Sequence, residues 1–111
     1  MKKRILLVQP PVYDFSAYDF WLKPYGLLRV GGMLRQRAEV LLFDYLDRLH
    51  PAAPGLRSDE WGCGAYFASQ IAKPEIFAAL PRRYKRFGLP REVFAAFLRD
   101  ARQDKVRRCT H

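Results

Sequence analysis

Residues 9–23 concentrate side chains that could bind a ligand. This stretch holds aromatic rings and carboxylates at an unusual density for a connecting segment, among them Tyr13, Asp14, Tyr18 and Asp19. Aromatic rings offer flat apolar surface to a large ligand, and polar groups orient that ligand. The sequence leaves open an alternative in which the rings cover a sheet edge as ordinary packing. We expect ligand binding by this segment.

A second group alternates cations with aromatic rings. Residues 81–88 place Arg82, Arg83, Lys85 and Arg86 around Tyr84. Guanidinium groups pair with phosphate oxygens, and rings stack on bases, so the pattern is typical of a nucleic-acid or phosphate patch. The alternative is docking of the four cations onto acidic groups of a neighbouring module. We expect them to contact a partner in either case.

Positive charge is concentrated near the end of the chain. Residues 81–111 hold ten Lys/Arg against three Asp/Glu, whereas residues 1–80 hold ten against eight, and the net charge of the whole is +9. Such a surplus can attract nucleic acid or an acidic partner. No helix-turn-helix, RNA-binding aromatic signature or zinc-finger spacing accompanies it. A solvated helix face with an exposed terminus is therefore the simpler explanation.

The sequence predicts no catalytic residue and no metal ligand set. His50 and His111 are the two histidines, and neither lies at metal-ligand spacing from a cysteine or from the other histidine. Cys63 would be a reactive thiol only beside a base, and a passive loop cysteine is the simpler interpretation. No Gly-x-Gly-x-x-Gly turn follows Val8, which argues against nicotinamide or flavin binding of that type.

The elements that would position these groups begin with a βαβ unit. Two short apolar runs, residues 5–8 and 40–43, predict strands buried on both faces of a parallel sheet. Apolar residues at helical spacing follow Pro24, where a helix would begin. Gly31 and Gly32 weaken this helix unless its backbone lies very close to the sheet. A right-handed crossover leaves the strands parallel, so their carboxyl ends share one edge, which is the candidate site.

We therefore expect an α/β fold, a partial Rossmann-like (flavodoxin-like) βαβ unit with parallel strands and a helical extension. Residues 1–50 would form the βαβ half, and residues 51–72 a loop interrupted by proline and glycine. Residues 73–104 would form a basic helical segment, with helices over 75–80 and 91–104, and residues 105–111 a frayed tail. A chain of 111 residues has room for one small domain.

The composition predicts a soluble globular protein in the cytoplasm. Hydrophobic residues make up 50% of the chain and charged residues 28%. No apolar run approaches the roughly 20 residues that cross a bilayer, so we expect no membrane partner. The basic start is followed by four apolar residues before Gln9, too few for a signal peptide. Two cysteines, too few for a disulfide framework, suit a reducing compartment.

Blocks of proline, aromatic and charged residues mark the chain from residue 3 to about residue 104. They are Pro10-Pro11-Val12-Tyr13-Asp14-Phe15, Tyr18-Asp19-Phe20-Trp21-Leu22-Lys23-Pro24, Gly26-Leu27-Leu28, Glu39-Val40 to Asp44, Leu46-Asp47-Arg48, Lys73-Pro74 and Pro81-Arg82-Arg83-Tyr84-Lys85-Arg86. With these blocks the chain resembles the N-terminal region of radical SAM proteins that carry a cobalamin (B12)-binding domain. That resemblance implies a Rossmann-like domain holding cobalamin across the strand carboxyl ends. A barrel with an iron-sulfur cluster and S-adenosylmethionine would follow. The implied cofactor-binding residues are Gln9, Pro10, Tyr13, Asp14, Tyr18 and Asp44.

The chain departs from the family plan at several points. The cluster-binding Cys-x-x-x-Cys-x-x-Cys is absent, as are the third and later strands of the sheet. The Asp-x-His-x-x-Gly motif that supplies a lower cobalt ligand elsewhere is also absent, although radical SAM relatives often lack it. Arg37-Ala38 stand where relatives usually have a glycine at the end of the first helix.

We therefore expect a truncated cobalamin-binding-type domain of a radical SAM protein, not catalytic by itself. Its iron-sulfur cluster and S-adenosylmethionine would belong to a C-terminal domain beyond these residues. Two strands cover too little surface for a stable isolated sheet, so we expect self-association, pairing with the radical SAM domain or another chain, or marginal stability. The alternative function is a small basic interaction module that binds nucleic acid or an acidic protein through residues 82–86 and the tail.

Overall fold

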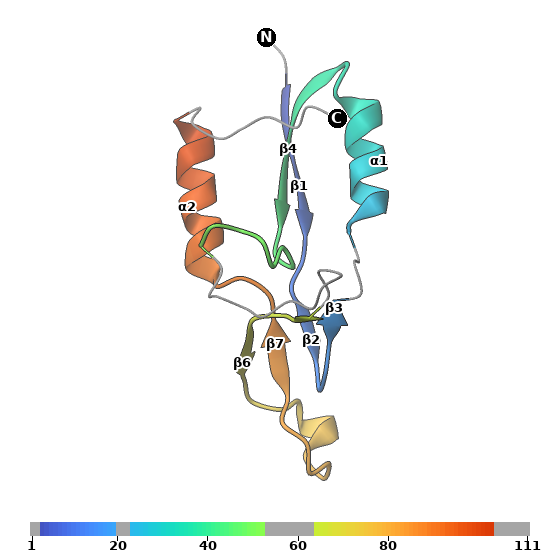
Figure 1. The fold of residues 1–111 in the computed structure, drawn as a ribbon, viewed down its shortest axis with the longest axis vertical. Helices are drawn as coiled ribbons and strands as arrows, with labels where there is room; N and C mark the ends of the chain where they lie inside the picture. The colour runs from blue at the N-terminus through green and yellow to red at the C-terminus, as the bar shows by residue number, and fades with distance from the viewer. Residues whose placement is uncertain (1–2, 20–22, 53–63, 104–111) are drawn as a thin grey trace. The chain divides into compact units, whose positions relative to one another are not determined.

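The structure is a computed structural model that describes residues 3–19, 23–52 and 64–103. These residues separate into two compact units. Unit 1 takes its residues from Met1–Pro10, Lys23–Tyr45 and Pro90–His111, and unit 2 takes them from Pro11–Leu22 and Leu46–Leu89. In chain order (Figure 1), the elements are β1 (Lys3–Gln9), β2 (Val12–Asp14), β3 (Tyr18–Asp19), α1 (Tyr25–Leu34), β4 (Ala38–Asp44), β5 (Gly64–Ala65), β6 (Ala68–Gln70), the 3-10 helix η1 (Glu75–Phe77), β7 (Lys85–Phe87) and α2 (Arg91–Arg102).

Unit 1 contains the predicted βαβ unit. Strands β1 and β4 pair in parallel, with Ile5 opposite Val40 and Gln9 opposite Asp44. Helix α1 connects them and contacts both strands, and Pro24 occupies its N-cap as predicted (Figure 1). The expected α/β fold with parallel strands is therefore confirmed. It is a partial one, because the parallel sheet has two strands within the described residues.

Glycine lets α1 approach this sheet closely. A Cβ atom added at Gly31 would lie 3.2 Å from Leu7 Cδ1 and 3.4 Å from Val40 Cγ1, side chains of the two paired strands. Gly32 has no heavy atom within 4 Å of the corresponding position. The close approach predicted for the glycine pair therefore depends on Gly31 alone. Gly32 costs the helix conformational entropy without a packing reason.

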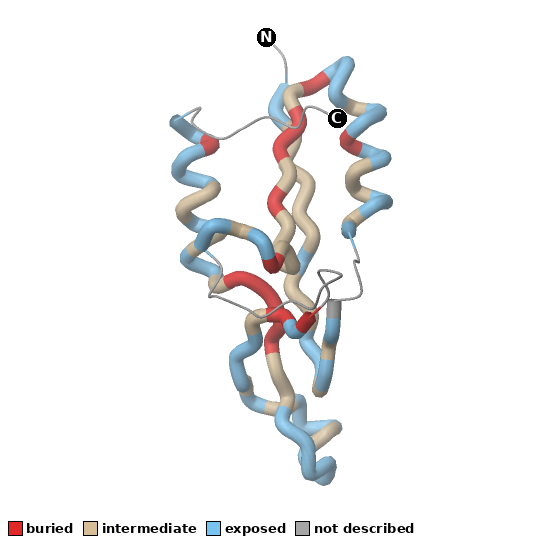
Figure 2. Tube along the Cα trace, in the orientation of Figure 1, coloured by how far each residue is buried: buried red, intermediate tan, exposed pale blue. Residues whose placement is uncertain are grey.

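Burial in unit 1 centres on β4. Val40, Leu41 and Phe43 are buried, and the Phe43 ring centroid lies 4.9 Å from that of Phe94 and 5.1 Å from that of Phe97 on α2. Figure 2 shows this buried stretch along β4. The prediction of burial on both faces is wrong for β1, whose residues 5–9 are only half-buried. The aromatic side chains of α2 pack on Phe43 and thereby bury β4 more deeply.

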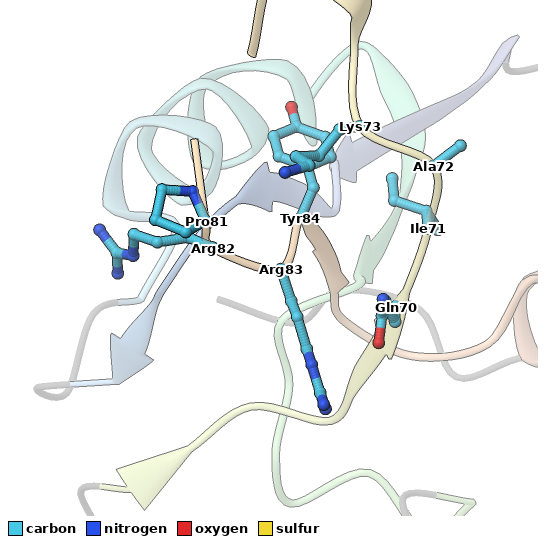
Figure 3. Close-up of a pocket in the computed structure, with 8 residues that line it drawn as sticks. All are labelled: Gln70, Ile71, Ala72, Lys73, Pro81, Arg82, Arg83 and Tyr84. Carbon is cyan, nitrogen blue, oxygen red and sulfur yellow. The ribbon is translucent and has the colours of Figure 1, made fainter. Parts of the chain in front are cut away.

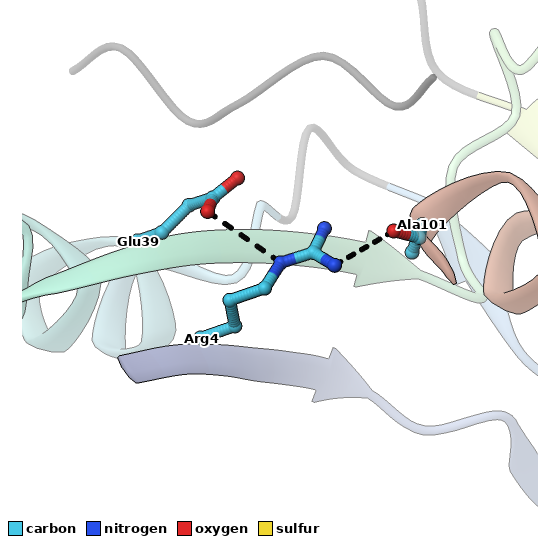
Figure 4. A network of polar contacts seen from close by, with 3 residues as sticks. All are labelled: Arg4, Glu39 and Ala101. Carbon is cyan, nitrogen blue, oxygen red and sulfur yellow. Dashed lines mark hydrogen bonds and ion pairs between the residues drawn. The ribbon is translucent and has the colours of Figure 1, made fainter. Parts of the chain in front are cut away.

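Arg4 ties three elements of unit 1 together (Figure 4). From β1, its Nε lies 3.5 Å from Glu39 Oε2 on β4, and its Nη1 donates a 2.7 Å hydrogen bond to the carbonyl oxygen of Ala101 on α2. Ala101 lies in the last turn of α2, where carbonyl oxygens lack helical partners and the helix dipole favours a cation. One guanidinium group therefore links both strands to the end of the helix.

Unit 2 is built from short antiparallel strands that the sequence did not predict. One sheet has the order β2-β7-β6, and β3 pairs separately with β5. The expected connection over residues 9–23 contains β2 and β3, and the expected loop over residues 51–72 contains β5 and β6. These strands have two or three residues each and pair with partners far along the chain, so local periodicity carries no sign of them.

The expected helical segment over residues 73–104 is partly right. Its end forms α2 over Arg91–Arg102, close to the predicted range, and η1 follows Pro74 as a shorter 3-10 turn. The helical prediction is wrong for the middle of the segment, because Lys85–Phe87 form the central strand of the antiparallel sheet. The predicted frayed tail over 105–111 lies outside the described residues. Among the helices that are described, none has the length and apolarity to cross a membrane.

We expect the two glycines of α1 to respond differently to alanine. Gly32→Ala should raise the free energy of unfolding by about 1 kcal/mol, because the position is open and alanine favours the helix. Gly31→Ala should give a clearly smaller gain or a loss, because its methyl group meets Leu7 and Val40. Urea denaturation of the two variants measures the difference. Equal stabilisation by both would contradict the close approach.

Replacing Arg4 should loosen unit 1. Arg4→Met removes the ion pair with Glu39 and the hydrogen bond to the Ala101 carbonyl while keeping much of the apolar stem. We expect a loss of about 1 kcal/mol in the free energy of unfolding. Lys3→Met removes the same charge one residue earlier on β1 and serves as the control. Thermal and urea denaturation should separate the two variants, and indistinguishable stabilities would argue against the bridge.

Candidate functional site

The edge predicted from the βαβ pattern is present in unit 1. Gln9 and Asp44 end β1 and β4 as register partners, and both are half-buried. The carbonyl oxygen of Gln9 accepts a 3.0 Å hydrogen bond from the Tyr45 amide, which extends the pairing one residue past the strands. Pro10 follows and is exposed. The carboxyl ends of the parallel strands therefore place an amide and a carboxylate side chain next to each other.

The other three predicted cofactor residues belong to unit 2. Tyr13 and Asp14 lie on β2 opposite Arg86 and Lys85, and Tyr18 lies on β3 opposite Ala65. Tyr13, Asp14 and Tyr18 are exposed. Asp14 Oδ1 accepts a 2.6 Å hydrogen bond from the Phe15 amide. The predicted set is therefore held as two groups, one in each unit, and its cofactor role stays a prediction. Phe20 and Trp21 lie outside the described residues.

The acidic and aromatic segment, residues 9–23, pairs through β2 with the basic run, residues 81–88. Strand β7 lies between β2 and β6 and carries Lys85 and Arg86, two of the four cations predicted to bind a partner. Arg86 is only 8% exposed, and its Nη1 donates a 3.0 Å hydrogen bond to the Leu89 carbonyl. Its role in the described fold is structural. Lys85 is half-buried, while Arg82 and Arg83 are exposed and accessible to a partner.

Phe15 anchors an aromatic cluster in unit 2. Its ring centroid lies 5.4 Å from that of Phe77 and 5.3 Å from that of Tyr84, both in edge-to-face geometry. The guanidinium carbon of Arg82 lies 5.5 Å from the Phe15 centroid, within cation-π range. For Phe15 these contacts favour the packing interpretation of the segment over ligand binding.

A pocket that the sequence did not predict lies at the base of the connection between β6 and β7. It has a volume of about 350 Å³ and is drawn in Figure 3. Its lining contains three cations and no carboxylate, and consists of Gln70, Ile71, Ala72, Lys73, Pro81, Arg82, Arg83 and Tyr84. The sequence shows the cations of residues 81–88 and Lys73. It does not predict the antiparallel pairing of β6 and β7 that brings these residues together.

The described residues offer no metal site of the usual kind. No group of three or more His, Cys, Asp or Glu side chains in residues 3–19, 23–52 and 64–103 is arranged to hold a metal ion. The Nδ1 atom of His50 accepts a 3.0 Å hydrogen bond from the Ala52 amide, a local turn contact. Cys63, Cys109 and His111 lie outside the described residues.

Comparisons with known proteins returned no relative. No family model matches the chain, no curated protein matches it, and no solved structure matches it. The resemblance to cobalamin-binding radical SAM proteins therefore stays a prediction based on sequence blocks. The geometry of the two units has to support any functional proposal.

The aromatic cluster can be tested by truncating its centre. Phe15→Ala should lower the free energy of unfolding by about 2 kcal/mol, less than for a fully buried ring because Phe15 is half-buried. Ile76→Ala, which removes an 84% exposed side chain from the same unit, should change it little. Amide hydrogen exchange of residues 84–87 provides the measurement. Equal protection in both variants would mean that the contacts of Phe15 do not stabilise residues 84–87.

Proposed function

We propose that this chain is a cobalamin-binding-type α/β unit of a radical SAM protein and that it binds the cofactor without catalysing a reaction by itself. The observation that carries the proposal is the parallel pairing of β1 and β4, which end together at Gln9 and Asp44. Ligands of open α/β sheets bind outside the carboxyl ends of the strands. Of the sequence blocks that resemble the family, one lies on β4, and others follow β1 and β4.

The residues at this edge suit part of cobalamin. The corrin ring carries amide side chains at its rim, and the Gln9 amide and Asp44 carboxylate provide a donor and acceptors for such groups. Within the described residues no imidazole ends either strand, so an axial cobalt ligand is not among the contacts proposed. Cobalamin would supply the cobalt-centred chemistry when bound. Gln9 and Asp44 would bind and orient its rim. The cofactor role expected for Tyr13, Asp14 and Tyr18 stays a prediction.

The division of labour follows from the chemistry of the chain. The described residues contain no group of three or more His, Cys, Asp or Glu side chains that could hold a metal ion. Iron-sulfur and S-adenosylmethionine chemistry would accordingly come from a radical SAM domain, which is the proposed protein partner. The exposed Arg82 and Arg83 would contact that domain or a second copy of the chain. The role proposed for the chain is to hold and present the cofactor.

Hydroxocobalamin binding tests this proposal. Titration of the protein with hydroxocobalamin should produce a saturable change in the corrin absorbance spectrum. Gln9→Ala should weaken binding by roughly three- to tenfold, the worth of one hydrogen bond, and Asp44→Asn should weaken it further. Gln36→Ala and Asp100→Asn make the same chemical changes at exposed positions away from the edge and should bind like the parent protein. Circular dichroism checks that each variant remains folded.

Two results would overturn the cofactor proposal. The first is the absence of a saturable spectral change at cofactor concentrations well above that of the protein. The second is equal weakening by the edge variants and their controls, which would indicate nonspecific contact. Weakening by Tyr13→Phe or Tyr18→Phe would support the predicted cofactor role of these tyrosines, and unchanged binding would restrict the contacts to the strand ends.

A basic interaction module is the second candidate function. The observation that favours it is the exposure of Arg82 and Arg83 in a chain of net charge +9. Such a module would bind nucleic acid or an acidic protein by electrostatic attraction. Anisotropy of a labelled RNA or DNA oligomer should then fall steeply as salt rises, because phosphate contacts release counterions. Salt-insensitive or undetectable oligomer binding would leave the cofactor proposal as the better explanation.

A further inference from the structure

The pocket between residues 70–73 and 81–84 has walls fixed by the backbone. The two segments continue the antiparallel pairing of β6 and β7, and the Ile71 amide donates a 3.1 Å hydrogen bond to the Tyr84 carbonyl. The turn between them is closed by further bonds, from the Phe77 amide to the Pro74 carbonyl and from Lys73 Nζ to the Leu80 carbonyl. The backbone of both segments is therefore fixed before a ligand arrives, which lowers the entropic cost of binding.

The aromatic cluster supports the pocket wall formed by residues 82–84. Tyr84 lines the pocket and also packs against Phe15 and Phe77, at centroid distances of 5.3 Å and 6.2 Å. Arg82 lies over the Phe15 ring. Figure 3 shows Arg82 and Arg83 leaving the chain in different directions, with Arg83 extended. Two of the lining side chains are thus held in place by contacts outside the pocket.

The charge of the lining selects an anion. Lys73, Arg82 and Arg83 line the pocket together with no Asp or Glu, and the nearby Glu75 is exposed and outside the lining. Within the described residues Arg83 has no hydrogen-bond or ion-pair partner, so its five N–H donors are available to a ligand. A planar guanidinium binds two oxygens of a phosphate at once. A phosphate ester offers these donors more oxygen atoms than a single carboxylate does.

The remaining lining selects an organic group. Ile71, Ala72 and Pro81 are apolar, and the Tyr84 ring adds aromatic surface. A volume of about 350 Å³ lies at the lower end of the range for small-molecule sites, roughly 300 to 1,000 Å³. An inorganic ion would leave most of that space to water. The lining therefore favours a small molecule that combines an anionic and an apolar part.

We propose that this pocket binds a small organic phosphate. Its phosphate group pairs with the Arg83 guanidinium, and its apolar group lies against the side chains of residues 71, 72 and 81. The site lies wholly within unit 2, whereas the strand edge proposed for cobalamin lies in unit 1. The strand edge and the pocket share no residue, so hydroxocobalamin binding and phosphate binding can succeed or fail independently.

Titration with 1-naphthyl phosphate tests the site. Isothermal calorimetry and amide NMR spectra of the full chain should show one binding event, with shift changes concentrated at residues 70–73 and 82–84. Inorganic phosphate and 1-naphthol, each carrying half of the probe, should bind at least about tenfold more weakly. Similar affinity for inorganic phosphate and for the probe would overturn the proposal, as would shifts spread over all basic residues.

Arg83 variants give the sharper measurement. Arg83→Ala should weaken binding of 1-naphthyl phosphate about tenfold, the loss expected for a charge-assisted hydrogen bond. Arg83→Lys keeps the charge without the bidentate geometry. Its affinity for 1-naphthyl phosphate should lie between those of the parent protein and Arg83→Ala. Arg29→Ala removes an exposed arginine from α1 in unit 1 and should bind like the parent protein. Equal weakening in Arg83→Ala and Arg29→Ala would mean that net charge alone controls binding, and it would overturn the proposed site.

A single-stranded RNA decamer distinguishes the small ligand from a nucleic-acid partner. Under the proposal the decamer binds no more tightly than 1-naphthyl phosphate and competes for the same residues. Tighter decamer binding, with an affinity that falls steeply with salt, would assign this surface to nucleic acid and overturn the small-molecule site. Loss of hydroxocobalamin binding in Arg83→Ala would also contradict the independence of the two sites.

Discussion

The parallel register between β1 and β4 is the constraint on which the rest of unit 1 depends. It places Ile5 opposite Val40 and brings Gln9 and Asp44 to one edge. Helix α1 returns the chain over both strands, and a Cβ atom at Gly31 would lie 3.2 Å from Leu7 Cδ1, so glycine at this position favours the close approach. Phe43 then packs on the rings of α2, and Arg4 fastens the end of that helix. Glycine at position 31 lowers the intrinsic stability of α1, but it allows the helix to approach the two strands closely.

Unit 2 depends on a different interaction, the pairing of β7 with β2 and β6. Two segments that look like separate candidate sites in the sequence are there joined into one sheet. Their chemistry is partly consumed by this pairing, since Phe15 packs in the aromatic cluster and Arg86 is buried. Arg82 and Arg83 remain exposed and accessible to a ligand, and they line a pocket together with Lys73. A charged run can thus be structural at one end and available to ligands at the other.

Elements with a strong local signal were predictable. The apolar runs at residues 5–8 and 40–43, the proline before α1 and the amphipathic spacing of α2 each reflect contacts within a few residues, and the structure places all four as expected. The edge formed by Gln9 and Asp44 followed from handedness of the crossover. The short strands of unit 2 were missed, because hydrogen bonds between segments 15 to 75 residues apart stabilise them. Lys85 and Arg86 have no strand periodicity of their own.

The sequence by itself determined the parallel βαβ unit, the identity of its edge residues and the excess of positive charge, because these follow from residue type and from spacing over one or two turns. Only the tertiary structure decided which of the charged and aromatic residues remain accessible. Arg86 and Phe15 are engaged in packing, while Arg83 lines a pocket with Lys73. The physical reason is that burial and pocket formation depend on pairing across the chain, and the free energy of such pairing is not encoded in any single segment.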